Sequence, residues 1–418
     1  MTLVETRPLA VPTQAGPPSR RPWKSALRAG LAIWAAVTVT HVAVSALAWL
    51  PRRDGQAPDL WTMVLNWNRW DAGHYVRIAD SGYHLGPGFP AFFPLYPLLV
   101  HIFDFVLPGD ALISALVVAN AAAIGALTVL HRLAEHEFGP RVAQRAAWYL
   151  AAFPTGFFLF IGYNESLFLL LAVGALYAGR RGHWWLAGVL GGLSSAARLF
   201  GVLLVVPLAV EYLRQISWAS QRASSPREPS WRELSRPGRW VGRIRFDVLG
   251  LALVPLGVVA YSLYCWAELG NPLAFSVAQD QWGRHYTLPG GAWVDAVRQI
   301  GGHRLLGAGS LGSLVDAGTT LVAVVLLVLC VAGRFKFRRD QLYLVVQAAL
   351  TLVLLMSTEV GGRPMQSAAR YVLEAVAVIL LLARLGANQI VDRAVLMIGV
   401  ALQAVFLVVF MAGTFLVA

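Results

Sequence analysis

The chain has 418 residues, of which 57% are hydrophobic and 13% charged, and its mean hydropathy is +0.60. Soluble domains are roughly 45–50% apolar and about 25% charged, so this composition excludes an ordinary soluble globular protein. The formal net charge of +12 would suggest a nucleic-acid partner in a soluble chain, and here its meaning depends on where the charges lie. The sequence has no Walker A motif, which excludes a nucleotide-hydrolysing pump of that kind.

The N-terminal part predicts a tail followed by a membrane helix. Residues 1–25 are polar and rich in proline, which is typical of a disordered tail. Residues 29–50 carry no charge, and this run is longer than the apolar core of a signal peptide. We therefore expect a retained first helix, and a single transmembrane domain over residues 26–418.

Nine further apolar runs follow the first one. The run 184–213 is too long for one ordinary span, and because Arg198 lies near its middle we interpret it as two passes that turn at Arg198. The sequence thus predicts an all-α polytopic membrane protein with about 11 transmembrane helices. An alternative makes residues 92–106 a span and 184–213 a single pass. The runs lie at 111–130, 146–162, 165–179, 184–213, 247–267, 314–333, 341–357, 371–383 and 394–417.

The charged residues divide unequally between the two sets of loops in this topology. One set holds 24 of the 34 Lys and Arg residues and includes a basic loop at 214–246, whereas 13 of the 22 acids fall in the other set. Because Lys and Arg concentrate in cytoplasmic loops, the first set is predicted to be cytoplasmic. The N-terminus is then inside and the C-terminus outside. The positive charge indicates orientation and no nucleic-acid partner.

The first predicted extracytoplasmic loop, residues 51–110, holds the most informative stretch. A helix over residues 67–81 would place an acid among aromatic side chains on one face, which carries Trp67, Trp70, Asp71, His74, Tyr75 and Ile78. An acid at a membrane boundary is costly and tends to be functional, although acids are also common in the first turn of a helix. Asp71 is therefore a candidate general base.

The residues around Asp71 resemble a known family. The loop that reads Arg69-Trp70-Asp71-Ala72-x-His74-Tyr75, followed by Phe92-Phe93-Pro94, is similar to the first luminal loop of the PIG-V family, the second mannosyltransferase of GPI-anchor assembly. Two later segments resemble the motifs that follow in that family, namely Tyr163-Asn164-Glu165-Ser166 and Arg198-x-x-Gly201, and Gln366-x-x-x-Arg370-Tyr371 matches it more loosely. Here Leu199-Phe200 replaces a Ser-Asn pair and Asn164 replaces a serine, which bears on the acceptor more than on the reaction.

The resemblance implies a glycosyltransferase fold of the GT-C type. It implies a cell-membrane mannosyltransferase that works on the extracytoplasmic side, with inversion, on a polyprenyl-phosphate-mannose donor. The acceptor would be a lipid-linked or glycan molecule, and membrane lipids would be the other partners. No cofactor or metal is expected, in keeping with the absence of an Asp-x-Asp motif and of zinc-ligand spacing in the sequence.

In this scheme Asp71 takes a proton from the acceptor hydroxyl, and cationic groups stabilise the leaving phosphate. Arg198 is the preferred phosphate ligand. The other candidates are Arg370 and the pair Arg284 and His285, which lies in the second long outer loop, residues 268–313. The other expected substrate-binding residues are Arg69, Trp70, His74, Tyr75, Asn164, Glu165 and Tyr371.

Structural roles stay open for several of these residues. Arg198 is equally explained as an arginine that reaches the membrane surface, Glu165 as a helix-start acid and His74 as a packing residue. Trp282 is expected in the interfacial aromatic belt, and Glu359 and Arg363 in a loop. The rival functions are a transporter or lipid flippase, and a membrane assembly factor without catalysis.

Overall fold

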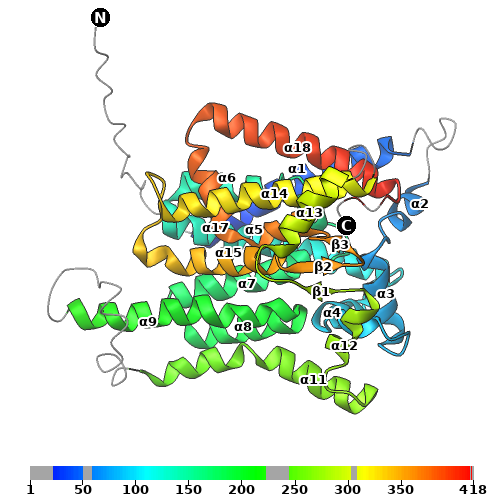
Figure 1. The fold of residues 1–418 in the computed structure, drawn as a ribbon, viewed down its shortest axis with the longest axis horizontal. Helices are drawn as coiled ribbons and strands as arrows, with labels where there is room; N and C mark the ends of the chain where they lie inside the picture. The colour runs from blue at the N-terminus through cyan, green and yellow to red at the C-terminus, as the bar shows by residue number, and fades with distance from the viewer. Residues whose placement is uncertain (1–21, 50–58, 223–243, 303–307, 415, 417–418) are drawn as a thin grey trace, which may run out of the picture.

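The computed structural model describes residues 22–49, 59–222, 244–302, 308–414 and 416. The described chain is built almost entirely of helices (Figure 1). In chain order they are α1 Pro22–Leu47, α2 Leu60–Leu65, α3 Asp71–Ser81, η2 Phe89–Ala91, α4 Leu95–Asp104, α5 Ala111–Phe138, α6 Pro140–Ala151, η3 Gly156–Leu159, α7 Glu165–Arg180, α8 Trp184–Ala197, η4 Leu199–Leu204, α9 Val205–Arg222, η7 Phe246–Leu253 and α11 Leu256–Leu269.

The second half adds three short strands to the helices. Its elements are α12 Ala274–Gln281, β1 His285–Tyr286, α13 Gly291–Gly302, α14 Ala308–Val331, η8 Arg339–Gln341, α15 Leu342–Leu355, β2 Thr358–Val360, β3 Arg363–Pro364, α16 Ala368–Tyr371, η9 Val372–Glu374, α17 Val376–Leu385 and α18 Gln389–Met411.

Five of the described helices are long and apolar enough to cross a membrane, and the bent pair η7 and α11 would make a sixth. The predicted helical membrane architecture is therefore confirmed, while the number of about 11 spans stays a prediction. The five segments are Pro22–Leu47, Ala111–Phe138, Leu199–Ser217, Gly309–Val331 and Gln389–Met411.

Several predicted boundaries differ from those observed. α1 begins at Pro22, so the last residues of the expected tail are helical, and residues 1–21 lie outside the described part. α9 continues to Arg222, well into the expected basic loop, of which residues 223–243 are not described. The run 146–162 is no single helix, because α6 ends at Ala151, just before Pro154, and proline cannot continue a helix there.

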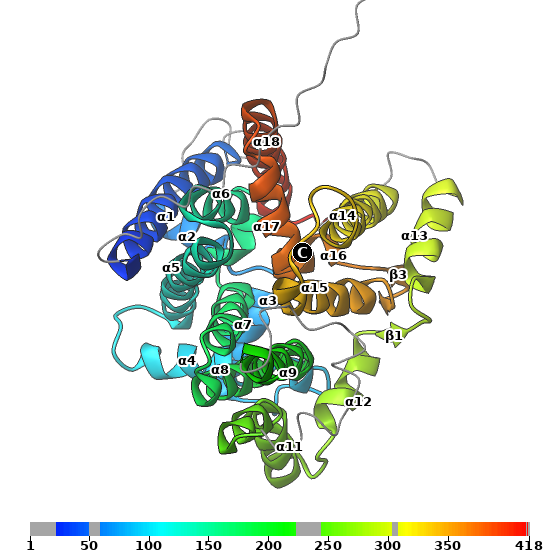
Figure 2. The ribbon, with the colours of Figure 1, turned by 90° about the vertical axis from the view of Figure 1, so that its left-hand side faces the viewer.

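Helix α7 lies among other helices of the bundle, and its two ends carry charged residues. It packs against α5, α8 and α9, and Figure 2, which looks along the long axis, shows α5, α7 and α8 side by side. Its 16 residues span about 24 Å at 1.5 Å per residue. Glu165, its first residue, and Arg180, its last, therefore lie at opposite ends of this helix.

Glycines allow α8 and η7 to approach each other closely. A Cβ atom on Gly188 of α8 would lie 1.9 Å from the carbonyl oxygen of Gly250 in η7. Small residues permit such backbone contacts between membrane helices.

We expect Gly188→Ala to lower the free energy of unfolding by about 1–3 kcal/mol, because the clash is with backbone and only separation of the two helices relieves it. Thermal unfolding in one detergent would measure this loss. Gly318→Ala in α14 is the matched control, since a Cβ atom there meets nothing within 4 Å. Equal melting temperatures for both variants would contradict the prediction.

The three strands join two outer segments that are distant in the sequence. β1 pairs antiparallel with β2, with His285 opposite Glu359, and β2 pairs antiparallel with β3. The strands and α3 lie in the right-hand half of Figure 1. Glu359 and Arg363, which we expected in a loop, thus lie in strands, and strands of two or three residues leave no alternation that a sequence could reveal.

The helix predicted over residues 67–81 begins later than expected. α3 starts at Asp71, and Trp70 before it has a φ of +53°, which is incompatible with helix. Trp67 and Trp70 therefore do not share the helical face of Asp71. The face that α3 buries consists of Ala72, Tyr75, Val76, Ile78 and Ala79.

Candidate active site

A cavity lies where α3, the end of α8, α12 with β1, and α16 meet. It holds about 1140 Å³ of empty space, its open mouth included. Its walls combine aromatic, charged and amide side chains. They include Trp70, Asp71, His74, Tyr75, Phe92, Phe93, Arg198, Leu199, Phe200, Gln279, Trp282, Arg284, Tyr286, Gln366, Ser367, Arg370 and Tyr371.

Asp71 is held at this cavity by an arginine from the far end of the sequence. Nη1 of Arg370 donates to Oδ2 of Asp71 over 2.8 Å. The Arg370 side chain is 3% exposed, whereas that of Asp71 is 28% exposed, so the carboxylate is the member of the pair that solvent or a ligand can reach. α3 positions Asp71 as its first residue, where the helix dipole favours a negative charge.

Behind this pair the charges continue into the protein. Oε1 of Glu165 lies 3.2 Å from Nε of Arg370 and 2.6 Å from Nη2 of Arg198. Nη1 of Arg198 donates to Oε1 of Glu374 over 2.6 Å. We call Asp71, Arg370, Glu165, Arg198 and Glu374 the ion chain; its three acids and two arginines give a formal charge of −1.

Aromatic rings enclose the two arginines of the ion chain. The guanidinium of Arg370 lies 4.7 Å from the ring centre of Tyr371 and 5.3 Å from that of Tyr163. Arg198 lies 5.1 Å from the same Tyr371 ring. Burial alone would lower the pKa of Arg370, but Tyr371, Asp71 and Glu165 outweigh that effect and raise it well above its ordinary value. Both arginines therefore stay cationic and fixed in orientation.

His74 packs among aromatic rings on the cavity wall. Its ring centre lies 5.0 Å from that of Phe92 and 5.1 Å from that of Trp282. Burial lowers the pKa of His74, and the nearby charge of Asp71 only partly offsets this. The imidazole is therefore neutral near pH 7, and the ring contacts give it a packing role as well as a place on the wall.

Most of the residues predicted from the sequence meet at this cavity. It is lined by Trp70, Asp71, His74, Tyr75, Arg198, Arg284, Arg370 and Tyr371. Glu165 and Asn164 lie buried beneath it, and Nδ2 of Asn164 donates to the carbonyl oxygen of Ala197, next to Arg198. Arg69 does not line the cavity, because its guanidinium bonds to the Asn66 side chain and backbone.

The sequence analysis missed three kinds of site residue. Glu374 is one of the 13 acids of the outer set and received no role from the sequence, although an acid in the apolar run 371–383 is a signal for a buried partner. Trp282 was assigned to the interfacial belt, yet it lines the cavity. Gln279 carried no signal, and Gln366 stood only in the loosely matching segment Gln366-x-x-x-Arg370-Tyr371, with no role assigned to it. Among the described residues, no three His, Cys, Asp or Glu side chains form a group that could hold a metal ion.

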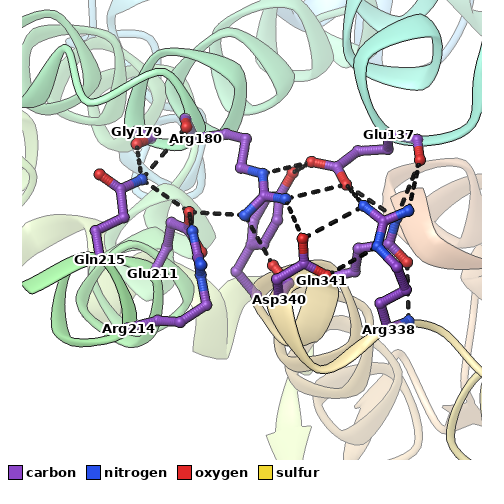
Figure 3. A network of polar contacts seen from close by, with 10 residues as sticks. Glu137, Gly179, Arg180, Glu211, Arg214, Gln215, Arg338, Asp340 and Gln341 are labelled. Atoms are coloured by element: carbon purple, nitrogen blue, oxygen red, sulfur yellow. Dashed lines mark hydrogen bonds and ion pairs between the residues drawn. The ribbon is translucent and has the colours of Figure 1, made fainter. Parts of the chain in front are cut away.

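A second charged network lies at the opposite end of α7, and Figure 3 shows it. The guanidinium of Arg180 sits between Glu137 of α5, Glu211 of α9 and Asp340 of η8, at 2.6, 3.1 and 2.7 Å. Arg214 and Arg338 add further pairs, and Gln341 and Tyr343 donate to Glu137. This network, called the Arg180 network below, ties four segments together.

The family match covers less than half of the chain. Residues 48–222 match the family described as Mannosyltransferase (PIG-V). The chain is 35% identical over 148 residues to GPI alpha-1,6-mannosyltransferase 2 of Rattus norvegicus, a match that covers 33% of this chain and 30% of that protein. It is 37% identical over 95 residues to GPI mannosyltransferase 2 of Yarrowia lipolytica, covering 22% and 27%. The matches thus span less than a third of these curated relatives.

The fold is similar to that of a solved membrane protein over nearly the whole chain. The structure of ArnT from Cupriavidus metallidurans bound to undecaprenyl phosphate superposes with a TM-score of 0.50 at 15% identity, covering 91% of this chain and 76% of that chain. At this identity the likeness concerns the fold alone, and it confirms the predicted GT-C architecture.

Proposed function

We propose that the chain, whose residues 48–222 match the PIG-V mannosyltransferase family and whose fold is of the GT-C type, is an integral membrane mannosyltransferase. The donor is polyprenyl-phosphate mannose, the acceptor is a glycolipid or a glycan, and transfer takes place on the extracytoplasmic face of the cell membrane. Neither a cofactor nor a metal takes part in this scheme.

The observation that carries this proposal is the Asp71–Arg370 pair at the cavity wall. A carboxylate that is partly exposed, oriented by a buried arginine and placed among aromatic side chains suits a general base that must meet a hydroxyl group. Arg370 engages Oδ2, and among the described residues Oδ1 makes no hydrogen bond. Oδ1 is therefore the atom that accepts the proton in our scheme.

The proposed reaction is a single displacement. The acceptor oxygen attacks the anomeric carbon of mannose as its proton moves to Asp71. The bond between that carbon and the phosphate oxygen breaks, and polyprenyl phosphate leaves with the electron pair. Because attack and departure occur on opposite sides, the configuration inverts. Trp70, Tyr75 and Tyr371 would contact the sugar, while Glu165 and Asn164 position other groups from below.

Two further observations support the orientation and the lipid donor. The charged residues that the sequence assigns to one face, Asp71, Glu165, Arg198, Arg284 and Arg370, gather at one end of α7, and Arg180 with its partners at the other. The similar ArnT structure holds undecaprenyl phosphate, a lipid phosphate of the class proposed here.

The experiment is a transfer assay with radiolabelled polyprenyl-phosphate mannose and membranes that contain the protein. We expect label to move into a glycolipid or glycan fraction, and the anomeric configuration of the product to be opposite to that of the donor. Donor that crosses the membrane without transfer would favour the flippase alternative. Membranes without the protein are the control, and no transfer above that level, with several acceptor extracts, would contradict the proposal.

A further inference from the structure

We propose that Arg284, and not Arg198 or Arg370, is the residue that binds the donor phosphate. This inference rests on the proposed function and gives one group of the same site a specific ligand. The ligand chemistry is the oxyanion of a phosphate ester attached to a lipid.

The two arginines of the ion chain are already neutralised. Arg198 has a carboxylate at 2.6 Å on each of two nitrogens, from Glu165 and Glu374. Arg370 is paired with Asp71 at 2.8 Å and with Glu165 at 3.2 Å. Because each of these guanidinium groups already faces two carboxylates, a phosphate would have to compete with those carboxylates for either arginine.

Arg284 is the cation of the cavity wall that lacks such partners. It lines the same cavity, and its Nε is buried without a hydrogen-bond partner. Within the part of the chain that the structure describes, its guanidinium makes no ion pair. A buried, unpaired donor on a cationic group is costly, and a bound oxyanion would remove that cost.

The backbone around Arg284 is fixed at both sides of the residue. Its N–H donates to the carbonyl oxygen of Gln279 over 3.0 Å, and the N–H of Gly361 donates to Gly283 over the same distance. Gly283 has a φ of +59°, which favours glycine, and it turns the chain from α12 into β1. An ordered backbone that carries an unpaired guanidinium is arranged in advance for an anion.

The segment that carries Arg284 also contacts the first outer loop. Nε1 of Trp282 donates to the carbonyl oxygen of Gly88 over 2.9 Å, so the segment with Arg284 is docked on the loop that carries Asp71. A Cβ atom on Gly88 would lie 3.1 Å from that nitrogen, so little space separates the two segments. The proposed base, Asp71, and the proposed phosphate ligand, Arg284, thus come from different outer loops, and the hydrogen bond of Trp282 holds these loops together.

The neighbouring side chains favour a phosphate that is attached to a lipid. Leu199, Phe200 and Phe92 give the same cavity an apolar wall. A planar guanidinium binds two oxygens of a phosphate at once, and apolar walls accept the adjoining isoprenoid units. Free phosphate would gain the contacts with the guanidinium but not those with the apolar walls.

The test is the affinity for undecaprenyl phosphate of the full-length protein in lipid nanodiscs. We expect Arg284→Ala to weaken binding about 10- to 100-fold, as for the loss of a charge-assisted hydrogen bond. Arg298→Ala is the matched control, because Arg298 lies in the same outer segment, is exposed and pairs with Asp295. Undecaprenol, which lacks the phosphate, should bind weakly and equally to all three proteins.

Three outcomes would overturn the assignment. The first is that Arg284→Ala binds undecaprenyl phosphate as tightly as wild type, and the second is that Arg298→Ala loses as much affinity as Arg284→Ala. The third is that phosphatidylglycerol competes as strongly as undecaprenyl phosphate, which would make the site a general site for lipid headgroups. Inorganic phosphate should compete with undecaprenyl phosphate for wild type, but more weakly than the lipid phosphate does. Loss of this competition in Arg284→Ala would support the assignment.

The transfer assay separates this inference from the proposed function. Arg284→Ala should raise the KM for the donor and leave that for the acceptor unchanged. If wild type transfers mannose and Arg284→Ala has the same KM for the donor, the inference about Arg284 is refuted while the proposed function stands. Absence of transfer by wild type, together with phosphate binding that depends on Arg284, would refute the function and keep the binding site.

Discussion

Asp71→Asn is expected to lower mannosyl transfer by about 10²- to 10⁴-fold, the usual contribution of a general base. Asparagine has nearly the same shape and can still accept the hydrogen bond from Arg370, but it cannot take the proton of the acceptor hydroxyl. The rate of transfer from polyprenyl-phosphate mannose in membranes, at equal protein level, measures the effect.

The control for this variant lies on the same helix. Asp80→Asn removes an exposed acid of α3 that does not line the active-site cavity, and it should transfer at the wild-type rate. Arg370 keeps Glu165 as a partner in Asp71→Asn, so the melting temperature should change little. Full activity in Asp71→Asn, or an equal loss in Asp80→Asn, would show that Asp71 is not the base.

The ion chain explains which parts of the site the sequence could predict. Asp71 and Arg370 were both recognisable as charged groups on one face, but their pairing joins residues 299 positions apart, which no local pattern encodes. Arg198 was recognised because an arginine inside an apolar run needs a partner. That its partners are Glu165 and Glu374 depends on how α8, α7 and η9 pack, and therefore only the structure shows that its charge is already balanced.

The fold was predictable where long apolar runs carry it. α5, α7, α14, α15 and α18 all begin within six residues of the runs expected from hydropathy. The outer loops were less predictable, since the positive φ of Trp70 and the short strand β1 arise from contacts with other segments. The residues that place Arg284 belong to this second group, so its role could not be separated from that of the other arginines beforehand.

Arg180→Ala is expected to lower the free energy of unfolding by about 3–5 kcal/mol, the usual cost of removing one partner from a buried ion pair. The substitution leaves Glu137 and Glu211, whose side chains are 0% and 1% exposed, short of a cation. The contacts from α7 to α5, α9 and η8 through Arg180 are lost together (Figure 3). Thermal unfolding in a single detergent, with the temperature shift compared between variants, measures the effect.

The neighbouring Arg181 provides the matched control for this prediction. Arg181 is exposed, so Arg181→Ala should change the free energy of unfolding by no more than about 0.5 kcal/mol. Because α7 places the Arg180 network about 24 Å from Glu165, surviving Arg180→Ala protein should keep the wild-type KM for the donor. Equal melting temperatures for the two variants would mean that the Arg180 network adds nothing to stability. A donor KM that rises in Arg180→Ala alone would show that this end of the bundle affects the active site.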